Sequence, residues 1–460
     1  MKRSSPKAPH YHFIGIGGIS MSGLAAILLQ EGFQVSGCDT QMSDLTDGLK
    51  KQGAIIYQGH HPTHLEGVDR VVATTAIPEH EPELMEARRR NIPTLRRVQL
   101  LGEILSQGYS LGVTGSHGKT TTSAMLASIF LEAGTDPTVV LGAKLPSMGG
   151  SARHGKGRYR IAEVDESDPW FSHLALDVAV VLNLEPDHVG TPTEQRPNYH
   201  PDFSSLQEAV RRFARNARRL VYNAEWPGLE GLLLHPNRVS FGLERGHCHA
   251  RNLGLFPMAS RFEVVWNNEP LGVVELRVPG LHNVVDALAA TAVALVEGLP
   301  FSAVQKALAA FRGAHRRFER LGEVRGAWLV DDYAHNPTKV RSALEAAKGT
   351  GRWVRAVFQP HRYLRTAQLW AELAEALSLA DEALVLEVYS AGEPPIPGVS
   401  GRMIAERLIE KGHNAKFMGW NEALDYLQNN IKDGDLVLTI GAGDVWRLGH
   451  ELLERAKERA

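Results

Sequence analysis

The chain has few cysteines and no excess of charge of either sign. Its 460 residues contain only Cys38 and Cys248, too few for a disulfide framework, which is typical of proteins kept in a reducing compartment. Lys and Arg number 50 against 52 Asp and Glu, so no basic surplus points to nucleic acid. We therefore expect neither a disulfide-stapled domain nor a nucleic-acid partner.

Long apolar runs are also missing. The stretch 13–29 follows a basic start and resembles the apolar core of a signal peptide, but glycines and serines interrupt it and no small-residue cleavage site follows Leu29. It is also shorter than the roughly 20 apolar residues that a membrane span needs. There is no internal repeat and no low-complexity segment. We expect a cytoplasmic protein without a membrane partner, whose oligomeric state the sequence does not reveal.

The chain alternates short β-rich runs with helical ones, the pattern of parallel sheets with crossover helices. Its length predicts two to four domains. We expect an α/β fold with three domains: an N-terminal Rossmann-like domain (1–107), a central P-loop ATPase-type domain (108–313) and a C-terminal Rossmann-like domain (314–460). Residues 235–280 are expected to form an antiparallel β insertion within the central domain, and residues 95–108 a helical segment.

A phosphate loop is predicted at residues 110–125, SLGVTGSHGKTTTSAM. The common spelling places a glycine five residues before the Gly-Lys pair, where this chain has Val113. The context still fits, because a strand, a small-residue turn and a helix start put free N–H groups before an anion. Lys119 supplies a cation and Thr120 a hydroxyl for Mg²⁺. The alternative is a plain glycine turn that exposes its lysine.

A second glycine turn, GIGGISMSG at 15–23, is less specific. The third glycine of the dinucleotide pattern is replaced by Ser20, and Asp39 ends the next strand. The turn suits a dinucleotide, another nucleotide diphosphate or no ligand at all.

Acidic side chains follow two strands of the central domain. Glu166 lies in AEVDESDPWF, and Glu185, Asp187 and His188 lie in NLEPDHVG. Carboxylates beside a P-loop usually hold the Mg²⁺ that bridges phosphate oxygens, and a histidine suits a second metal. Such acids are also common in solvated turns, which is the interpretation we favour for Glu163 and Asp168 taken singly.

The third domain carries cations and polar groups at its strand ends. In FQPHRYLRT, the side chains of His361, Arg362 and Arg365 form a candidate clamp for a carboxylate. VDDYAHNP ends a neighbouring strand in the same way. The alternative is a loop of surface cations.

Taken together and in order, these motifs resemble the Mur ligases, ATP-dependent enzymes that form amide bonds in peptidoglycan precursors. The resemblance covers nearly the whole chain, and GSHGKT matches the family's two-glycine P-loop. It rests on these stretches: GIGGISMSGLA, GSHGKTTT, VDESD, EPDH, RRFE, DDYAHNPT, FQPHRYLRT and AGEPPIPGVSG. Within the family, they point to the member that joins L-alanine to UDP-N-acetylmuramate.

The resemblance implies ATP and Mg²⁺ as cofactors, and UDP-N-acetylmuramate, L-alanine and ATP as partners. Catalysis would rest on Lys119, Glu166 and His188, with Thr120, Glu166 and His188 as metal ligands. ATP would meet Gly115, Ser116, His117, Gly118, Lys119, Thr120, Thr121, Asn283, Arg317, Asp332, Tyr333 and His335. The UDP-sugar would meet Gly15, Gly17, Gly18, Ser20, Met21, Ser22 and Asp39. His361, Arg362 and Arg365 would hold L-alanine.

The chain departs from the family pattern at four places. Asp286 stands where the adenine motif usually has a second Asn, and Gly190 with a lengthened loop stands where a carboxylate follows His188. Asn336 replaces a frequent second histidine, and Glu81 replaces a common Asn. These changes leave the phosphate chemistry in place.

Two rival functions remain open. One is another ligase of this fold, which adds a different amino acid or a ready-made tripeptide to the same nucleotide sugar. The other is a regulator whose P-loop senses ATP without turnover, although a sensor has no need of His361 and its neighbours.

Overall fold

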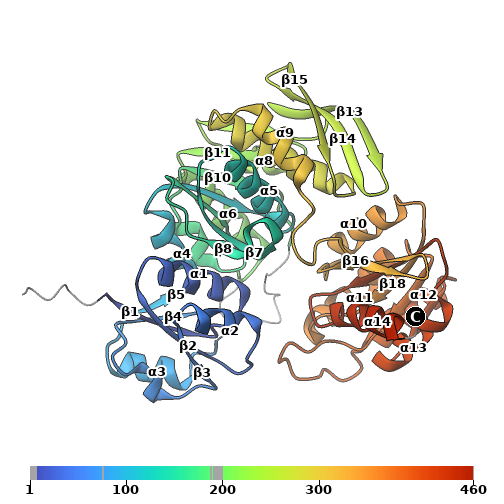
Figure 1. Cartoon of the computed structure of the whole chain (residues 1–460), viewed down its shortest axis with the longest axis horizontal. Helices are drawn as coiled ribbons and strands as arrows, with labels where there is room; N and C mark the ends of the chain where they lie inside the picture. The colour runs from blue at the N-terminus through green and yellow to red at the C-terminus, as the bar shows by residue number, and fades with distance from the viewer. Residues whose placement is uncertain (1–7, 75–76, 187–188, 190–199, 459–460) are drawn as a thin grey trace, which may run out of the picture. The chain divides into compact units, whose positions relative to one another are not determined.

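The computed structural model describes residues 8–74, 77–186, 189 and 200–458. It contains three β-sheets connected by helices, which confirms the predicted α/β class (Figure 1). Its residues form two compact units, one of 1–251, 263–273 and 285–308 and the other of 252–262, 274–284 and 309–460. Among the described residues, no helix has the length and apolar character needed to cross a membrane.

The first sheet has five parallel strands in the order β3-β2-β1-β4-β5. Along the chain, its elements are β1 (His10–Ile14), α1 (Ile19–Gln30), β2 (Gln34–Asp39), α2 (Asp44–Lys51), β3 (Ile55–Gln58), η1 (Pro62–Leu65), β4 (Arg70–Ala73), α3 (Pro82–Arg89), β5 (Thr94–Arg96) and α4 (Arg97–Leu105). The order reverses at β1, so the carboxyl end of β1 is a topological switch point, where open α/β sheets bind ligands.

The second sheet has ten strands in the order β15-β14-β13-β12-β11-β10-β6-β9-β7-β8. Its strands are β6 (Tyr109–Thr114), β7 (Thr138–Leu145), β8 (Gly150–Arg153), β9 (Tyr159–Glu163), β10 (Val178–Val181), β11 (Arg219–Asn223), β12 (Arg238–Phe241), β13 (Cys248–Phe256), β14 (Ala259–Trp266) and β15 (Glu269–Leu276). Its helices are α5 (Lys119–Glu132), η2 (Pro146–Met148), η3 (Pro169–His173), α6 (Phe203–Asn216), α7 (Leu229–Leu232), α8 (Leu281–Val296) and α9 (Phe301–Ala310). The P-loop strand β6 lies between β10 and β9, with parallel neighbours on both sides.

The third sheet has six strands in the order β16-β17-β21-β18-β19-β20. Its elements are β16 (Glu319–Val324), β17 (Ala327–Asp332), α10 (Pro337–Lys348), β18 (Trp353–Phe358), α11 (Tyr363–Leu377), β19 (Glu382–Val385), α12 (Gly401–Glu410), β20 (Ala415–Phe417), α13 (Trp420–Asn430), β21 (Asp435–Ile440) and α14 (Trp446–Glu458). Only β16 pairs antiparallel, with β17.

Apolar runs explain why the central strands form. β10 reads VAVV and all four of its residues are completely buried, as expected for a parallel strand covered on both faces. In the first unit, one apolar cluster extends from the five-stranded sheet into the ten-stranded sheet. Helices α1 and α4 of the first sheet contact β7, β8 and β9 of the second. These two sheets therefore share a core.

Two expectations about local structure need correction. Residues 94–96 form the edge strand β5 before helix α4 begins, so 95–108 is not helical throughout. Within the β insertion, β12 pairs parallel with both β11 and β13, so residues 235–280 are not antiparallel throughout. Both errors concern strand pairing, which depends on neighbouring strands outside the segment itself.

A buried ionic network stabilises the third sheet. Arg355 on β18 is 7% exposed and donates from Nε to Asp435 Oδ2 over 3.0 Å, and it also pairs with Glu382. Glu382 additionally accepts hydrogen bonds from Lys416 (2.8 Å) and Tyr426 Oη (2.6 Å). The network therefore compensates both buried carboxylates.

We expect Arg355→Met to lower the free energy of unfolding by about 3 kcal/mol, because it leaves two buried carboxylates without their shared cation. Urea denaturation measures this loss. Lys348→Met is the matched control, since Lys348 pairs with Asp381 at the surface, with side chains 41% and 33% exposed. This control should cost about 0–1 kcal/mol. Equal losses in the two variants would contradict a stabilising role for the buried network.

Candidate active site

The predicted P-loop joins β6 to α5 and has the required backbone geometry. Gly115 (φ +146°) and Gly118 (φ +81°) adopt conformations that side-chain-bearing residues rarely enter. A Cβ on Gly115 would lie 3.1 Å from Leu182 Cβ, and one on Gly118 would lie 2.5 Å from Asp286 Oδ1. Neither position tolerates a side chain. The turn therefore presents the start of α5, where the first N–H groups of a helix suit an anion.

Asn183 holds this loop in shape. Its Oδ1 accepts the N–H of His117 over 3.0 Å, and its Nδ2 donates to the carbonyl of His117 over 2.9 Å. Ser116 Oγ accepts the N–H of Glu185 over 2.8 Å. We did not predict Asn183 from the sequence. Its place at the end of a buried strand, in NLEPDH, was the available signal.

Lys119 and Glu166 form a buried ion pair inside the cradle. Lys119 Nζ lies 2.7 Å from Glu166 Oε2 and 2.5 Å from the carbonyl oxygen of Gly115. Burial lowers the pKa of Lys119, but the charges of Glu166, Asp165 and Glu163 outweigh it and raise this pKa above its ordinary value. Burial raises the pKa of Glu166, and Lys119 offsets only part of that rise. The structure thus brings the predicted phosphate cation and the predicted metal carboxylate together.

The same corner of the site suits a hard divalent cation. Glu166 is 1% exposed, and no described residue donates a hydrogen bond to its Oε1. Thr120 follows Lys119 in the first turn of α5, and its side chain is buried. Carboxylate and hydroxyl oxygens are the ligands that Mg²⁺ prefers, so these residues fit the ion. His188, Asp187 and Gly190 lie outside the described residues.

The other acidic side chains of this region have structural partners. Glu163 accepts the N–H of Gly142 over 2.8 Å. Asp168 is 2% exposed, caps η3 through Trp170 N and lies 3.4 Å from Arg96. Our prediction of solvated turn residues is therefore wrong for both: Glu163 is the half-buried last residue of β9, and Asp168 is buried. Its buried side chain caps the N-terminus of η3.

The first glycine turn follows β1 at the switch point of its sheet. The carbonyl oxygen of Cys38 accepts the N–H groups of Gly15 (2.9 Å) and Ile16 (3.0 Å). Asp39 Oδ2 accepts the N–H of Gly17 over 2.9 Å. Of the remaining predicted residues, Gly18 and Ser20 are accessible, whereas Met21 and Ser22 are buried in α1. The end of β2 thus holds the turn in place through hydrogen bonds.

A small cavity opens between this turn and the acidic strand end. It is lined by Ser20, Leu24, Arg97, Leu101, Val140, Leu141, Gly142, Glu163 and Asp165. Arg97 Nη2 donates to Asp165 Oδ2 over 3.2 Å. No motif in the sequence singles out Arg97, the first residue of α4.

In the third sheet, predicted ATP residues surround the end of β17. Asp332 accepts the N–H groups of Phe318 and Ala334, both over 2.8 Å, and burial raises its pKa to about 6 although Arg317 opposes the rise. The guanidinium of Arg317 lies 5.2 Å from the ring centre of Tyr333. His335 Nδ1 lies 2.9 Å from the carbonyl oxygen of Tyr333. Asn283, the other predicted ATP residue, lies on α8, away from this sheet in the sequence, and donates to the carbonyl oxygen of Pro279 over 2.6 Å.

The predicted amino-acid residues come together at the start of α11. Arg365 is 8% exposed, and its Nη1 lies 3.3 Å from His361 Nδ1. Burial, followed by the charges of Arg365 and Arg362, lowers the pKa of His361 to about 3, so its imidazole is neutral near pH 7. Arg362 Nη1 lies 3.6 Å from Glu393 Oε1. His361 also stacks on Tyr389 and lies 6.0 Å from the ring of His335.

Comparisons with known proteins decide the family. Profiles described as "Mur ligase family, catalytic domain", "Mur ligase middle domain" and "Mur ligase, glutamate ligase domain" match residues 10–109, 113–294 and 316–443. The chain belongs to the Mur ligase family. Its fold is similar to the crystal structure of the UDP-N-acetylmuramate-alanine ligase of Thermotoga maritima, with a TM-score of 0.84 and 30% identity over 98% of this chain and 100% of that chain.

Curated relatives of this Mur ligase match over almost their whole length. The UDP-N-acetylmuramate–L-alanine ligase of Deinococcus radiodurans is 42% identical over 98% of this chain and 96% of its own. The enzyme of the same name from Clostridium novyi is 40% identical over 96% and 97%.

The structure shows the local surroundings of three residues at which this Mur ligase departs from the family pattern. Asn336 is the N-cap of α10 and accepts the N–H of Lys339 over 2.9 Å. Glu81 caps α3 by accepting the N–H of Leu84 over 2.8 Å. Asp286 is 5% exposed and lies directly against Gly118 of the P-loop. The first two residues are thus used for helix capping.

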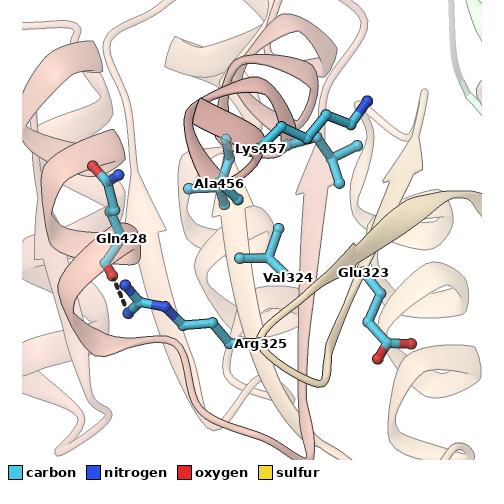
Figure 2. A pocket seen from close by; sticks show the side chains of 8 residues that line it. Glu323, Val324, Arg325, Gln428, Ala456 and Lys457 are labelled. Carbon is cyan, nitrogen blue, oxygen red and sulfur yellow. Dashed lines mark hydrogen bonds between the residues drawn. The ribbon is translucent and has the colours of Figure 1, made fainter. Parts of the chain in front are cut away.

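Another pocket of this Mur ligase lies in the third domain, between the β16–β17 turn and α14 (Figure 2). Arg325 reaches across it to the carbonyl oxygen of Gln428 over 2.9 Å (Figure 2). Among the described residues that line the pocket, none belongs to the predicted site. We assign it no part in the reaction.

Proposed function

We propose that this Mur ligase joins L-alanine to the lactyl carboxylate of UDP-N-acetylmuramate and converts ATP to ADP and phosphate. The observation that carries this function is the near-complete match to relatives named for that reaction, combined with a complete phosphate cradle around Lys119 and Glu166. The enzyme would act in the cytoplasm in peptidoglycan precursor synthesis, which suits its two reduced cysteines.

The proposed division of labour follows the three sheets. Residues 1–107 would bind the UDP-sugar at the first glycine turn, 108–313 would bind ATP at the P-loop, and 314–460 would bind the amino acid. Asn283, Arg317, Asp332, Tyr333 and His335 would complete the ATP site. The three sheets with their separate strand-end clusters support this division.

The chemistry follows from charge. A carboxylate is a poor acyl donor, so the terminal phosphoryl group of ATP is first transferred to the lactyl carboxylate, which gives an acyl phosphate and ADP. This step brings anions together, and Lys119 supplies positive charge in a buried cradle where charge acts strongly. The amine of L-alanine then attacks the acyl carbon and loses a proton, and phosphate leaves from the tetrahedral intermediate.

Thr120 and Glu166 would hold a Mg²⁺ ion in this reaction, and His188 a second cation. A bound Mg²⁺ ion would supply positive charge that offsets the negative charge of the phosphate groups. The buried Oε1 of Glu166, which no described residue engages, supports this assignment.

An amino-acid panel with UDP-N-acetylmuramate and ATP tests the substrate. Phosphate release should require both the nucleotide sugar and L-alanine, with glycine and L-serine as poor substitutes and bulky amino acids inactive. One methyl group in an apolar pocket discriminates by only about 1–3 kcal/mol, so weak use of glycine fits. Preference for a tripeptide would assign the chain to the rival ligase. ATP hydrolysis that ignores both acceptors would indicate a sensor.

Arg365→Ala is expected to raise the KM for L-alanine by at least about tenfold, with much smaller changes in the KM for ATP and for the nucleotide sugar. A guanidinium can grip a carboxylate through two hydrogen bonds, and L-alanine has few other handles. Steady-state kinetics with each substrate varied in turn measures this. Arg402→Ala is the matched control, because Arg402 is an exposed arginine of the same domain. An increase confined to the KM for ATP would move this cluster to the nucleotide.

A further inference from the structure

A cluster of metal-ligating side chains lies in the first sheet, and none of its members is a predicted site residue. His12 Nε2, Cys38 Sγ, His64 Nδ1 and a carboxylate oxygen of Glu83 all lie within 4.8 Å of one another. His12 and Cys38 come from the adjacent strands β1 and β2, His64 from η1 and Glu83 from α3. The fold thus gathers four donor atoms from four separate elements at one point.

The cluster is closed to solvent. His12, Cys38 and Glu83 have no exposed side-chain surface, and the side chain of His64 is 13% exposed. Glu83 Oε2 lies 3.0 Å from both His12 Nε2 and Cys38 Sγ, and Oε1 lies 2.7 Å from His64 Nδ1. The side chains of His12, Cys38 and His64 thus all contact the carboxylate of Glu83.

The charge of Glu83 makes a cation favourable here. Its two oxygens accept hydrogen bonds from His12, Cys38, His64 and the N–H of His61, the last over 2.8 Å. Among the described residues, its ion-pair partners are the imidazoles of His12 and His64, with no lysine or arginine. Buried charges in proteins are usually paired with an opposite charge or coordinate a metal ion. A divalent ion would supply the missing charge.

We propose that His12, Cys38, His64 and Glu83 bind one Zn²⁺ ion. The set of two imidazoles, one thiolate and one carboxylate is typical of tetrahedral zinc, with bonds of about 2.0–2.3 Å. Binding releases the proton of the Cys38 thiol, and the two negative ligands then balance the two positive charges of the ion. His12 Nδ1 lies 2.8 Å from Ser36 Oγ, a partner that directs Nε2 at the ion.

The ion would stabilise the proposed UDP-sugar loop through Cys38. Cys38 binds it through the side chain, while the carbonyl oxygen of the same residue holds the N–H groups of Gly15 and Ile16. Zinc would therefore link α3 and η1 to the turn that follows β1. Its role is structural, because all four protein ligands are used.

Cobalt titration tests this site, because Co²⁺ replaces Zn²⁺ and shows a thiolate-to-metal absorption band. The tag-free full-length protein is stripped with a chelator and titrated with Co²⁺, then with Zn²⁺. The Mg²⁺ site proposed above offers no thiolate, so cobalt bound there gives no such band. We expect one Co²⁺ per chain with the band, and its displacement by one Zn²⁺.

Cys38→Ser should abolish the band and weaken Zn²⁺ binding at least about tenfold. Cys248→Ser is the control, since Cys248 is equally buried but lies outside the cluster, and it should keep the band. Absence of the band in the wild-type protein would overturn the site, and this titration decides the matter even if Cys38→Ser fails to fold. A band that survives in Cys38→Ser, or that Cys248→Ser removes, would also overturn it.

Discussion

Lys119→Ala is expected to lower kcat at least about 10³-fold, the loss found when a cation is removed from a phosphoryl-transfer site. Lys119 Nζ lies at the start of α5, beside the carbonyl oxygen of Gly115 and the carboxylate of Glu166. Without this cation, the charge that develops on the transferred phosphoryl group is unopposed in a buried cradle. Phosphate release at saturating substrates measures the loss.

Lys144→Ala is the matched control for this variant. Lys144 is an exposed lysine on β7, in the same sheet as the P-loop, and its loss should leave kcat unchanged. The circular dichroism spectrum of Lys119→Ala should match the wild type at 25 °C, although the protein should unfold at a lower temperature because Glu166 loses its buried partner. Near-normal turnover in a correctly folded Lys119→Ala protein would remove the P-loop from the mechanism.

Glu166→Gln should lower kcat about 100-fold at ordinary Mg²⁺ concentrations and shift the Mg²⁺ dependence to higher concentrations. Glutamine keeps the size and one oxygen of the side chain but loses the charge that attracts a hard cation. If Glu166 is a metal ligand, added Mg²⁺ should restore part of the activity of Glu166→Gln. If Glu166 has only a structural role, added Mg²⁺ should restore none. Titration of the initial rate with Mg²⁺ at fixed ATP separates these two roles. His188→Ala tests the second cation by the same measurement.

The control for the metal assignment is Glu132→Gln. Glu132 is an exposed carboxylate at the end of α5, the helix that begins with Lys119, and its loss should not change the Mg²⁺ dependence. A wild-type Mg²⁺ dependence in Glu166→Gln would mean that the carboxylate serves only to pair with Lys119.

Local motifs made the P-loop predictable, because strand, glycine turn and helix start are contiguous in the chain. Its spacing placed Lys119 and Thr120 correctly at the start of α5. Glu166 could be paired with the loop only through the rule that parallel strands end at one edge, which holds here because β9 lies beside β6.

Contacts between distant segments could not be predicted in this way. Asn183 holds His117 across 66 residues, and Arg97 reaches Asp165 across 68, so neither pair has a signature in local spacing. Asn336 shows a different limit. The family resemblance marked this position only as one where a histidine is frequent. The structure shows that Asn336 caps α10, and its position directly before Pro337 is typical of a helix start.

The shared core of the first two sheets affects how the chain is synthesised. Helix α4 ends at Leu105, but β9, which it contacts, ends only at Glu163. At translation rates of about 5–20 residues per second, roughly 3–12 seconds separate the appearance of these two elements at the ribosome. During that interval the apolar sides of α1 and α4 lack their permanent partners. The nascent N-terminal segment therefore exposes apolar surface until β9 has been synthesised.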